Sequence, residues 1–185
     1  MAGGVNGAPR AGLELPLGAS ADEDDGCIQA AAEPAPPGSS TGKRTAKTAI
    51  TILTGAGLGF VEPTPAERSA LGVAFAMNGK VLYGAAYDVV RLAQPMDLSD
   101  PAAISTRLTE ITVCEIKSTN RASLTDDFNG YFFDLTTAEL LVAQSLGQQY
   151  LFAFVNTLTG RHLELSLNEL FARARKIYPK WAVRF

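Results

Sequence analysis

The 185-residue chain has 46% hydrophobic and 19% charged residues and a formal net charge of −3. This composition supports a hydrophobic core and excludes a collagen, a coiled coil and a disulfide-stapled miniprotein. Two cysteines are too few for a cysteine-based zinc site, and the single histidine excludes sites that need two imidazoles. No run reaches the roughly 18–20 apolar residues of a membrane span, and the N-terminus lacks a secretory signal. We therefore expect a cytoplasmic protein with no membrane partner.

The first 46 residues differ in composition from the rest of the chain. They contain six acidic residues and no aromatic residue, whereas every Phe, Tyr and Trp lies from Phe60 onward. A segment rich in Ala, Gly, Pro and Ser buries too little apolar surface to offset the entropy cost of ordering it. We predict a disordered tail over residues 1–46 and one folded domain over residues 47–185.

Hydrophobic periodicity in the folded part predicts a mixed α/β arrangement around a central sheet. Thr64 is the predicted N-cap of the first helix, and Thr136 with Glu139 has the spacing of a capping box. A loop is expected between the third and fourth strands, over residues 94–107. The predicted helices cover residues 65–78, 136–146 and 168–177, and the predicted strands cover residues 48–53, 80–83, 86–92, 108–118, 149–156 and 163–167.

Charged residues interrupt two of these predicted strands. Asp88 lies within 86–92, and Glu115 and Lys117 lie within 108–118. Side chains alternate along a strand, so Glu115 and Lys117 point to the same face, which Asp88 on the neighbouring strand can also reach. Two carboxylates beside one lysine form an oxygen-ligand site for Mg²⁺, with an amine to position or deprotonate a water. A solvated sheet edge with Glu115 and Lys117 as a surface pair explains the spacing equally well.

Four segments of the chain are considered together: YDVV at 87–90, VCEIKST at 113–119, YFFDLTTAEL at 131–140 and QQYLFAFV at 148–155. They resemble the PD-(D/E)XK nuclease superfamily, which has the restriction-endonuclease-like fold. In that family an acid begins or lies in the second core strand, and E-x-K lies in the third, within a helix–strand–strand–strand–helix–strand core. The resemblance covers about residues 60–157 and is greatest to the small nuclease-like domain of bacterial restriction proteins and the plant NO VEIN protein.

The resemblance implies an endonuclease of restriction or defence type that hydrolyses DNA phosphodiester bonds with Mg²⁺ or Mn²⁺. By this resemblance Asp88 and Glu115 ligate the metal, the Ile116 carbonyl is a further ligand, and Lys117 orients or activates the attacking water. An acid on the first helix is also typical of the family, and Glu67 is the best match for it.

The sequence departs from the family pattern in two places. Tyr87 stands where the family has Pro before the first acid, and the spacer from Asp88 to Glu115 is long, which requires an insertion at 94–107. Glu62 is the second choice for the helix acid. Glu139 can line the site, although its role in a capping box is the preferred interpretation.

The C-terminal segment is basic, unlike the chain as a whole. Residues 161–185 contain six Lys or Arg and two Glu, so their charge is six minus two, or +4. A basic face can bind a phosphate backbone even on an acidic protein, and an ordinary solvated helix face is the alternative. We expect DNA as the partner, with a homodimer or a restriction-system protein as a further candidate. The alternative function is a non-catalytic PD-(D/E)XK-like module that binds DNA or protein.

Overall fold

A computed structural model describes residues 40–178 of the chain. Most of the predicted tail lies outside the described residues. Its last part does not, because helix α1 spans Ser40–Gly55, so the predicted lack of regular structure is wrong for residues 40–46.

Helix α1 also replaces the strand that was expected at residues 48–53. Threonine and isoleucine favour a strand only weakly, and tertiary packing readily outweighs that preference. Ala49 and Leu53 lie four residues apart on the helix, and both are fully buried against the sheet. The burial of this apolar stripe explains the helix better than the local propensity of its β-branched residues.

The described residues form a mixed sheet whose strands follow one another in chain order. Strands β3 and β4 are parallel, and all the other neighbouring strands are antiparallel. The predicted mixed α/β fold with a central sheet between helices is confirmed. The five strands are β1 (Phe60–Val61), β2 (Val89–Leu92), β3 (Ile111–Thr119), β4 (Tyr150–Asn156) and β5 (His162–Leu165).

Capping boxes begin three of the remaining helices. Thr64, Thr136 and Ser166 each accept a hydrogen bond from the backbone of a Glu three residues later, and that Glu bonds back to the cap. The predicted N-caps Thr64 and Thr136 are therefore confirmed. The helices are α2 (Pro65–Met77), α3 (Pro101–Thr106), α4 (Thr137–Leu146) and α5 (Leu167–Arg173), with short 3-10 helices η1 (Leu108–Glu110) and η2 (Gly147–Gln149).

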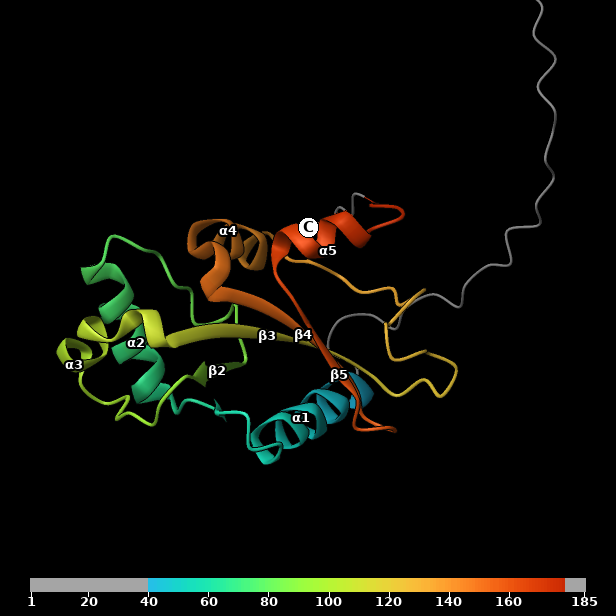
Figure 1. Cartoon of the computed structure of the whole chain (residues 1–185), viewed down its shortest axis with the longest axis horizontal. Helices are drawn as coiled ribbons and strands as arrows, with labels where there is room; N and C mark the ends of the chain where they lie inside the picture. The colour runs from blue at the N-terminus through green and yellow to red at the C-terminus, as the bar shows by residue number, and fades with distance from the viewer. Residues whose placement is uncertain (1–39, 179–185) are drawn as a thin grey trace, which may run out of the picture. The chain divides into compact units, whose positions relative to one another are not determined.

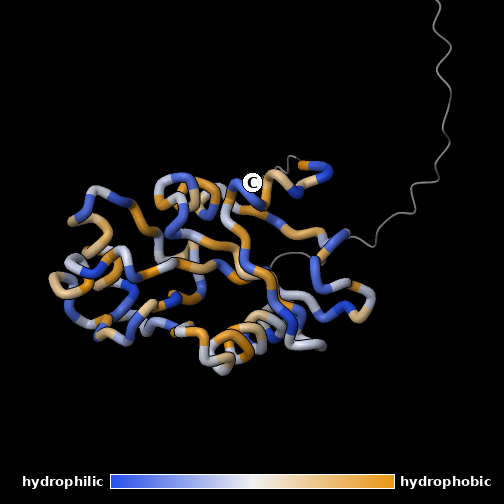
Figure 2. The backbone as a smooth tube through the Cα atoms, in the orientation of Figure 1, coloured by the Kyte–Doolittle hydropathy of each residue, from blue (hydrophilic) through white to orange (hydrophobic). Residues whose placement is uncertain are grey.

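The two faces of the sheet are covered by different helices (Figure 1). Helix α1 packs on one face, where Phe60, Val89 and Cys114 are buried. Helices α2 to α5 contribute to the core on the other face, around Val113 and Phe152. Figure 2 shows both hydrophobic and hydrophilic segments along the central strands, because β3 carries Glu115 and Lys117 among its apolar residues. Because side chains alternate along β3, Glu115 and Lys117 share the face of Val113, so both point toward the larger core.

Two further expectations, one about a strand and one about a loop, are wrong. Residues 80–83 form no strand, and the two residues of β1 pair with β2 in that place. The predicted loop at 94–107 contains helix α3, whose start is fixed by the Asp100 side chain accepting from the Ala102 N–H at 2.9 Å. An Asp cap followed by Pro is a helix-start signal that the composition of the loop obscured.

Gly59 fixes the approach of β1 to β2, and we predict that Gly59→Ala is strongly destabilising. Its φ is +81°, its carbonyl accepts from the Leu92 N–H at 2.9 Å, and an added Cβ would overlap the Leu92 carbonyl oxygen. We expect a loss of about 3 kcal/mol in the free energy of unfolding, measured by urea denaturation. Gly57→Ala is the control, because φ is +70° there and nothing lies within 4 Å, so it should lose only about 1 kcal/mol. Equal losses would contradict the overlap.

Candidate functional site: a buried cluster of carboxylates and a lysine

Asp88 lies beside Glu115 at the point where the β2–β3 ladder ends. The register pairs Val89 with Cys114, so Asp88 falls opposite Glu115 and on the same face of the sheet. The Asp88 N–H donates to the Cys114 carbonyl at 3.0 Å, and the Asp88 carboxylate accepts from the Ile116 N–H at 2.9 Å. These two hydrogen bonds fix the position of the carboxylate next to β3.

Lys117 forms ion pairs with two carboxylates from different elements. Its Nζ lies 3.0 Å from Glu115 Oε1 on the same strand and 2.7 Å from Glu139 Oε2 on helix α4. The side chains of Lys117, Glu115 and Glu139 are only 11%, 12% and 6% exposed. The predicted proximity of Glu115 and Lys117 on one face of the strand is confirmed. The alternative, a solvated surface pair, is wrong because both side chains are buried.

The electrostatics of this cluster reflect an excess of buried negative charge. Burial raises the pKa of Glu115 to about 8, with the charges of Asp88 and Glu139 adding to the effect and Lys117 opposing it. Burial also raises the pKa of Asp88, against the hydrogen bond from the Ile116 N–H and the charge of Lys117. Burial alone would lower the pKa of Lys117, but Glu115 and Glu139 together raise it. The ammonium of Lys117 therefore stays protonated, while the carboxyl groups of Asp88 and Glu115 resist ionisation.

Arg68 of helix α2 holds the backbone that leads into Asp88, and sequence reasoning missed it. Its guanidinium donates to the carbonyls of Gly84 at 3.1 Å and Tyr87 at 2.8 Å, and also to the carbonyl of Asp88. Its Cζ lies 4.5 Å from the centre of the Tyr87 ring, a cation–π distance. A planar group with several donors can brace such an irregular segment, but nothing in the sequence pairs Arg68 with these carbonyls.

Glu67 does not contact this cluster through any interaction found among the described residues. Its Oε2 accepts from the Thr64 N–H at 2.7 Å, within the capping box of α2. The third acid that the structure does bring to Lys117 is Glu139, from a different helix. A part for Glu67 in chemistry at the cluster stays a prediction.

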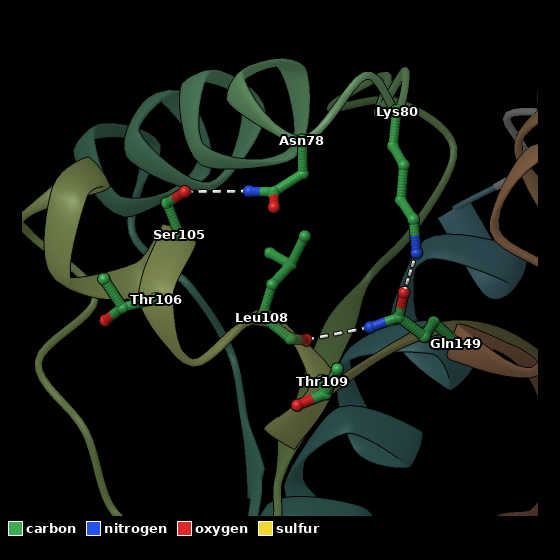
Figure 3. A pocket seen from close by; sticks show the side chains of 7 residues that line it. All are labelled: Asn78, Lys80, Ser105, Thr106, Leu108, Thr109 and Gln149. Carbon is green, nitrogen blue, oxygen red and sulfur yellow. Dashed lines mark hydrogen bonds between the residues drawn. The ribbon is translucent and has the colours of Figure 1, made fainter.

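A separate pocket of about 300 Å³ lies between the segment that follows α2, the end of α3 and the 3-10 helices η1 and η2 (Figure 3). Asn78 donates to Ser105 at 2.8 Å, Lys80 donates to Gln149, and Gln149 donates to the Leu108 carbonyl at 2.8 Å. These bonds connect the elements on either side of the pocket to one another. We interpret the pocket as a gap between elements that these polar side chains bridge. It lies at the opposite end of β3 from Lys117.

Neither a complete set of metal ligands nor a transmembrane helix is found among the described residues. Within residues 40–178, no group of three or more His, Cys, Asp or Glu side chains is arranged to hold a metal ion. The described helices include none with the length and apolar character of a transmembrane segment.

Stability should depend on pH through Glu115. Its pKa is about 8 in the folded protein against an ordinary 4.5, so the folded state binds the proton more tightly than the unfolded state. That contribution is complete below about pH 4.5 and is lost as the pH rises toward 8. Relative to Glu115→Gln, the wild type should therefore lose on the order of 3 kcal/mol of unfolding free energy between about pH 5 and pH 9. Urea denaturation in EDTA measures this difference, and parallel pH profiles for the two proteins would contradict it.

No protein-family model, curated protein or solved structure matches the chain.

Proposed function

We propose that the chain is a metal-dependent nuclease of the PD-(D/E)XK type that hydrolyses DNA phosphodiester bonds. The observation that carries the proposal is the convergence of Asp88, Glu115 and Lys117. The sequence resemblance assigns catalysis to these residues. Glu115 and Lys117 lie on β3, and Asp88, directly before β2, falls opposite Glu115 on the same face of the sheet.

The order of elements supports this proposal. Helix α1, strands β1, β2 and β3, helix α4 and strand β4 follow the helix–strand–strand–strand–helix–strand order of the family core. Their sheet order is sequential, and β4 is parallel to β3. On this alignment α2 and α3 are insertions, and α3 with η1 accounts for the long spacer between Asp88 and Glu115. The first core helix is then α1 rather than the helix of Glu67.

The donor set at the cluster fits a hard divalent cation. The carboxylates of Asp88 and Glu115 and the Ile116 carbonyl are the oxygen ligands that Mg²⁺ and Mn²⁺ prefer. Burial raises the pKa of both carboxylates, so each binds a proton tightly when no other positive charge is near. A divalent cation would replace those protons and compensate the buried negative charge. When bound, the ion would polarise the scissile phosphate and acidify a water. Lys117 would orient that water and stabilise negative charge on the phosphate oxygens.

DNA is the proposed substrate because exposed basic residues follow β4. Arg161 has a side chain that is 66% exposed, although it pairs with Asp126 at 2.9 Å. Arginine and lysine on a surface bind the phosphate backbone without reading sequence, so affinity should fall as salt rises. The other exposed basic residues of this segment are Arg173, Arg175 and Lys176, while Lys180 and Arg184 lie outside the described residues.

Cleavage of supercoiled plasmid and of single-stranded DNA by the purified full chain tests the proposal. We expect products that require Mg²⁺ or Mn²⁺, that EDTA prevents, and that form more slowly with Lys117→Ala. A protein that binds DNA but cleaves neither substrate with either metal, and that Lys117→Ala leaves unchanged, would refute the nuclease proposal.

One observation favours the second candidate, a non-catalytic module of the same fold that binds DNA or protein. Both carboxylates that hold Lys117 are buried, and each is already ion-paired with it. Such a cluster can serve the fold rather than a reaction. In that case DNA binding without cleavage is the expected result of the same assay.

A further inference from the structure

Glu139 does more than cap helix α4. Its Oε2 accepts from the Thr136 N–H at 3.1 Å and from Lys117 Nζ at 2.7 Å. Glu169 occupies the same position in the capping box of α5, and its Oε2 accepts from the Ser166 N–H at 2.8 Å. Glu139 is buried, whereas Glu169 is exposed and still completes its box. Capping alone therefore does not explain why the Glu139 carboxylate is buried against β3.

The ammonium of Lys117 needs a fixed counter-charge if it is to act at one point of the cluster. A lysine side chain has four flexible carbons, and holding its end in one place requires a partner that is itself fixed. Glu115 is one partner, but the proposed function also assigns it to the metal. Glu139 lies on a different element, and its own carboxylate is held by the backbone at the start of α4, where a negative charge is favoured.

We propose that Glu139 is the positioning residue for Lys117, holding the ammonium beside Glu115 and Asp88 from across the sheet–helix interface. This inference rests on the proposed nuclease function and deepens it. Glu139 is assigned no bond to the metal and no contact with the substrate. It acts through Lys117, as outer partners of catalytic groups do.

The test compares Glu139→Gln with Glu169→Gln in the full-length protein. Gln also completes a capping box, so both variants keep the helix start and lose one negative charge. Only Glu139→Gln removes a charged partner of Lys117. Glu139→Asp, which keeps the charge but withdraws it by one methylene, is the second variant if Glu139→Gln fails to fold.

Two readouts are needed. The first is the kcat for plasmid cleavage, measured together with the Mn²⁺ concentration that gives half the maximal rate. The second is the side-chain ammonium signal of Lys117 in ¹H–¹⁵N spectra of the metal-free protein, identified by its loss in Lys117→Ala. An ammonium held by two carboxylates exchanges its protons slowly enough to be seen, and a released one does not.

We expect Glu139→Gln to lower kcat by about 10- to 100-fold, with the Mn²⁺ requirement changed less than about twofold, and to lose the Lys117 signal. Glu139→Asp should change both readouts in the same direction, and Glu169→Gln should resemble the wild type. An unchanged kcat and Lys117 signal would show that Glu139 only caps α4. A raised Mn²⁺ requirement with an intact signal would make it a metal ligand and overturn the inference.

Failure of the proposed function gives a different pattern. In that case the wild type itself does not cleave DNA, and the ammonium spectra alone decide whether Glu139 holds Lys117. Loss of the signal in Glu139→Gln would then support the positioning contact, and its retention would overturn it.

Discussion

Asp88→Asn and Glu115→Gln are each expected to lower metal-dependent DNA cleavage by about 1,000-fold or more. Each substitution keeps the shape of the side chain and removes one of the two anionic ligands proposed for the metal. A Mg²⁺ site with so few protein carboxylates cannot lose one and keep its ion in place. Initial rates on supercoiled plasmid, over a range of Mg²⁺ and Mn²⁺ concentrations, measure the loss.

Glu110→Gln is the matched control for this experiment. Glu110 directly precedes β3, but its carboxylate pairs with Arg107 at 2.6 Å, away from the cluster. Its loss should leave cleavage unchanged. Circular dichroism and urea denaturation would show that the Asp88 and Glu115 variants are folded. Full activity in a folded Asp88→Asn protein would contradict the assignment of Asp88 as a ligand.

Lys117→Met is expected to cause the largest loss of stability among substitutions at the cluster. Methionine fits the volume of the lysine stem but leaves the carboxylates of Glu115 and Glu139 without their buried cation. Removing one partner of a buried ion pair typically costs about 3–5 kcal/mol, since the remaining charge is uncompensated. The loss should be greater near pH 9 than near pH 5, because Glu115, whose pKa is about 8, is protonated at the lower pH and then needs the lysine less.

Urea denaturation at both pH values measures this effect, with Lys176→Met as the control. Lys176 is exposed, so its substitution should change the unfolding free energy by no more than about 0.5 kcal/mol at either pH. A loss for Lys117→Met that is equally small would show that the cluster contributes little to the stability of the fold.

Local signals were sufficient to predict the two capped helices but not the edges of the sheet. Thr64 starts α2 as expected of a threonine directly before Pro65, and Thr136 starts α4 as its spacing to Glu139 indicates, because capping is set by neighbouring residues. Helix α1 was missed because its β-branched residues suggest a strand, and only the buried face against β3 shows otherwise. Strand β1 has two residues, too few for any periodicity to appear.

The candidate site was predictable to the extent that it lies on one strand. Glu115 and Lys117 are two residues apart, so alternation alone places them together. Asp88 required the register of β2 against β3, which the sequence supplied only through a family resemblance. Glu139 lies 22 residues from Lys117, on another element. Its spacing to Thr136 predicted the capping box but gave no indication of the contact with Lys117. Such a contact depends on how α4 packs on the sheet, which no local pattern encodes.

Calorimetric titration of the metal-free protein with Mn²⁺ tests most directly whether the cluster is a metal site. We expect saturable binding by the wild type and by Glu110→Gln, and loss of that binding in Asp88→Asn and in Glu115→Gln. Binding that is the same in all four proteins, or absent from the folded wild type, would contradict a metal site at the cluster and show that the buried carboxylates and lysine serve the fold alone.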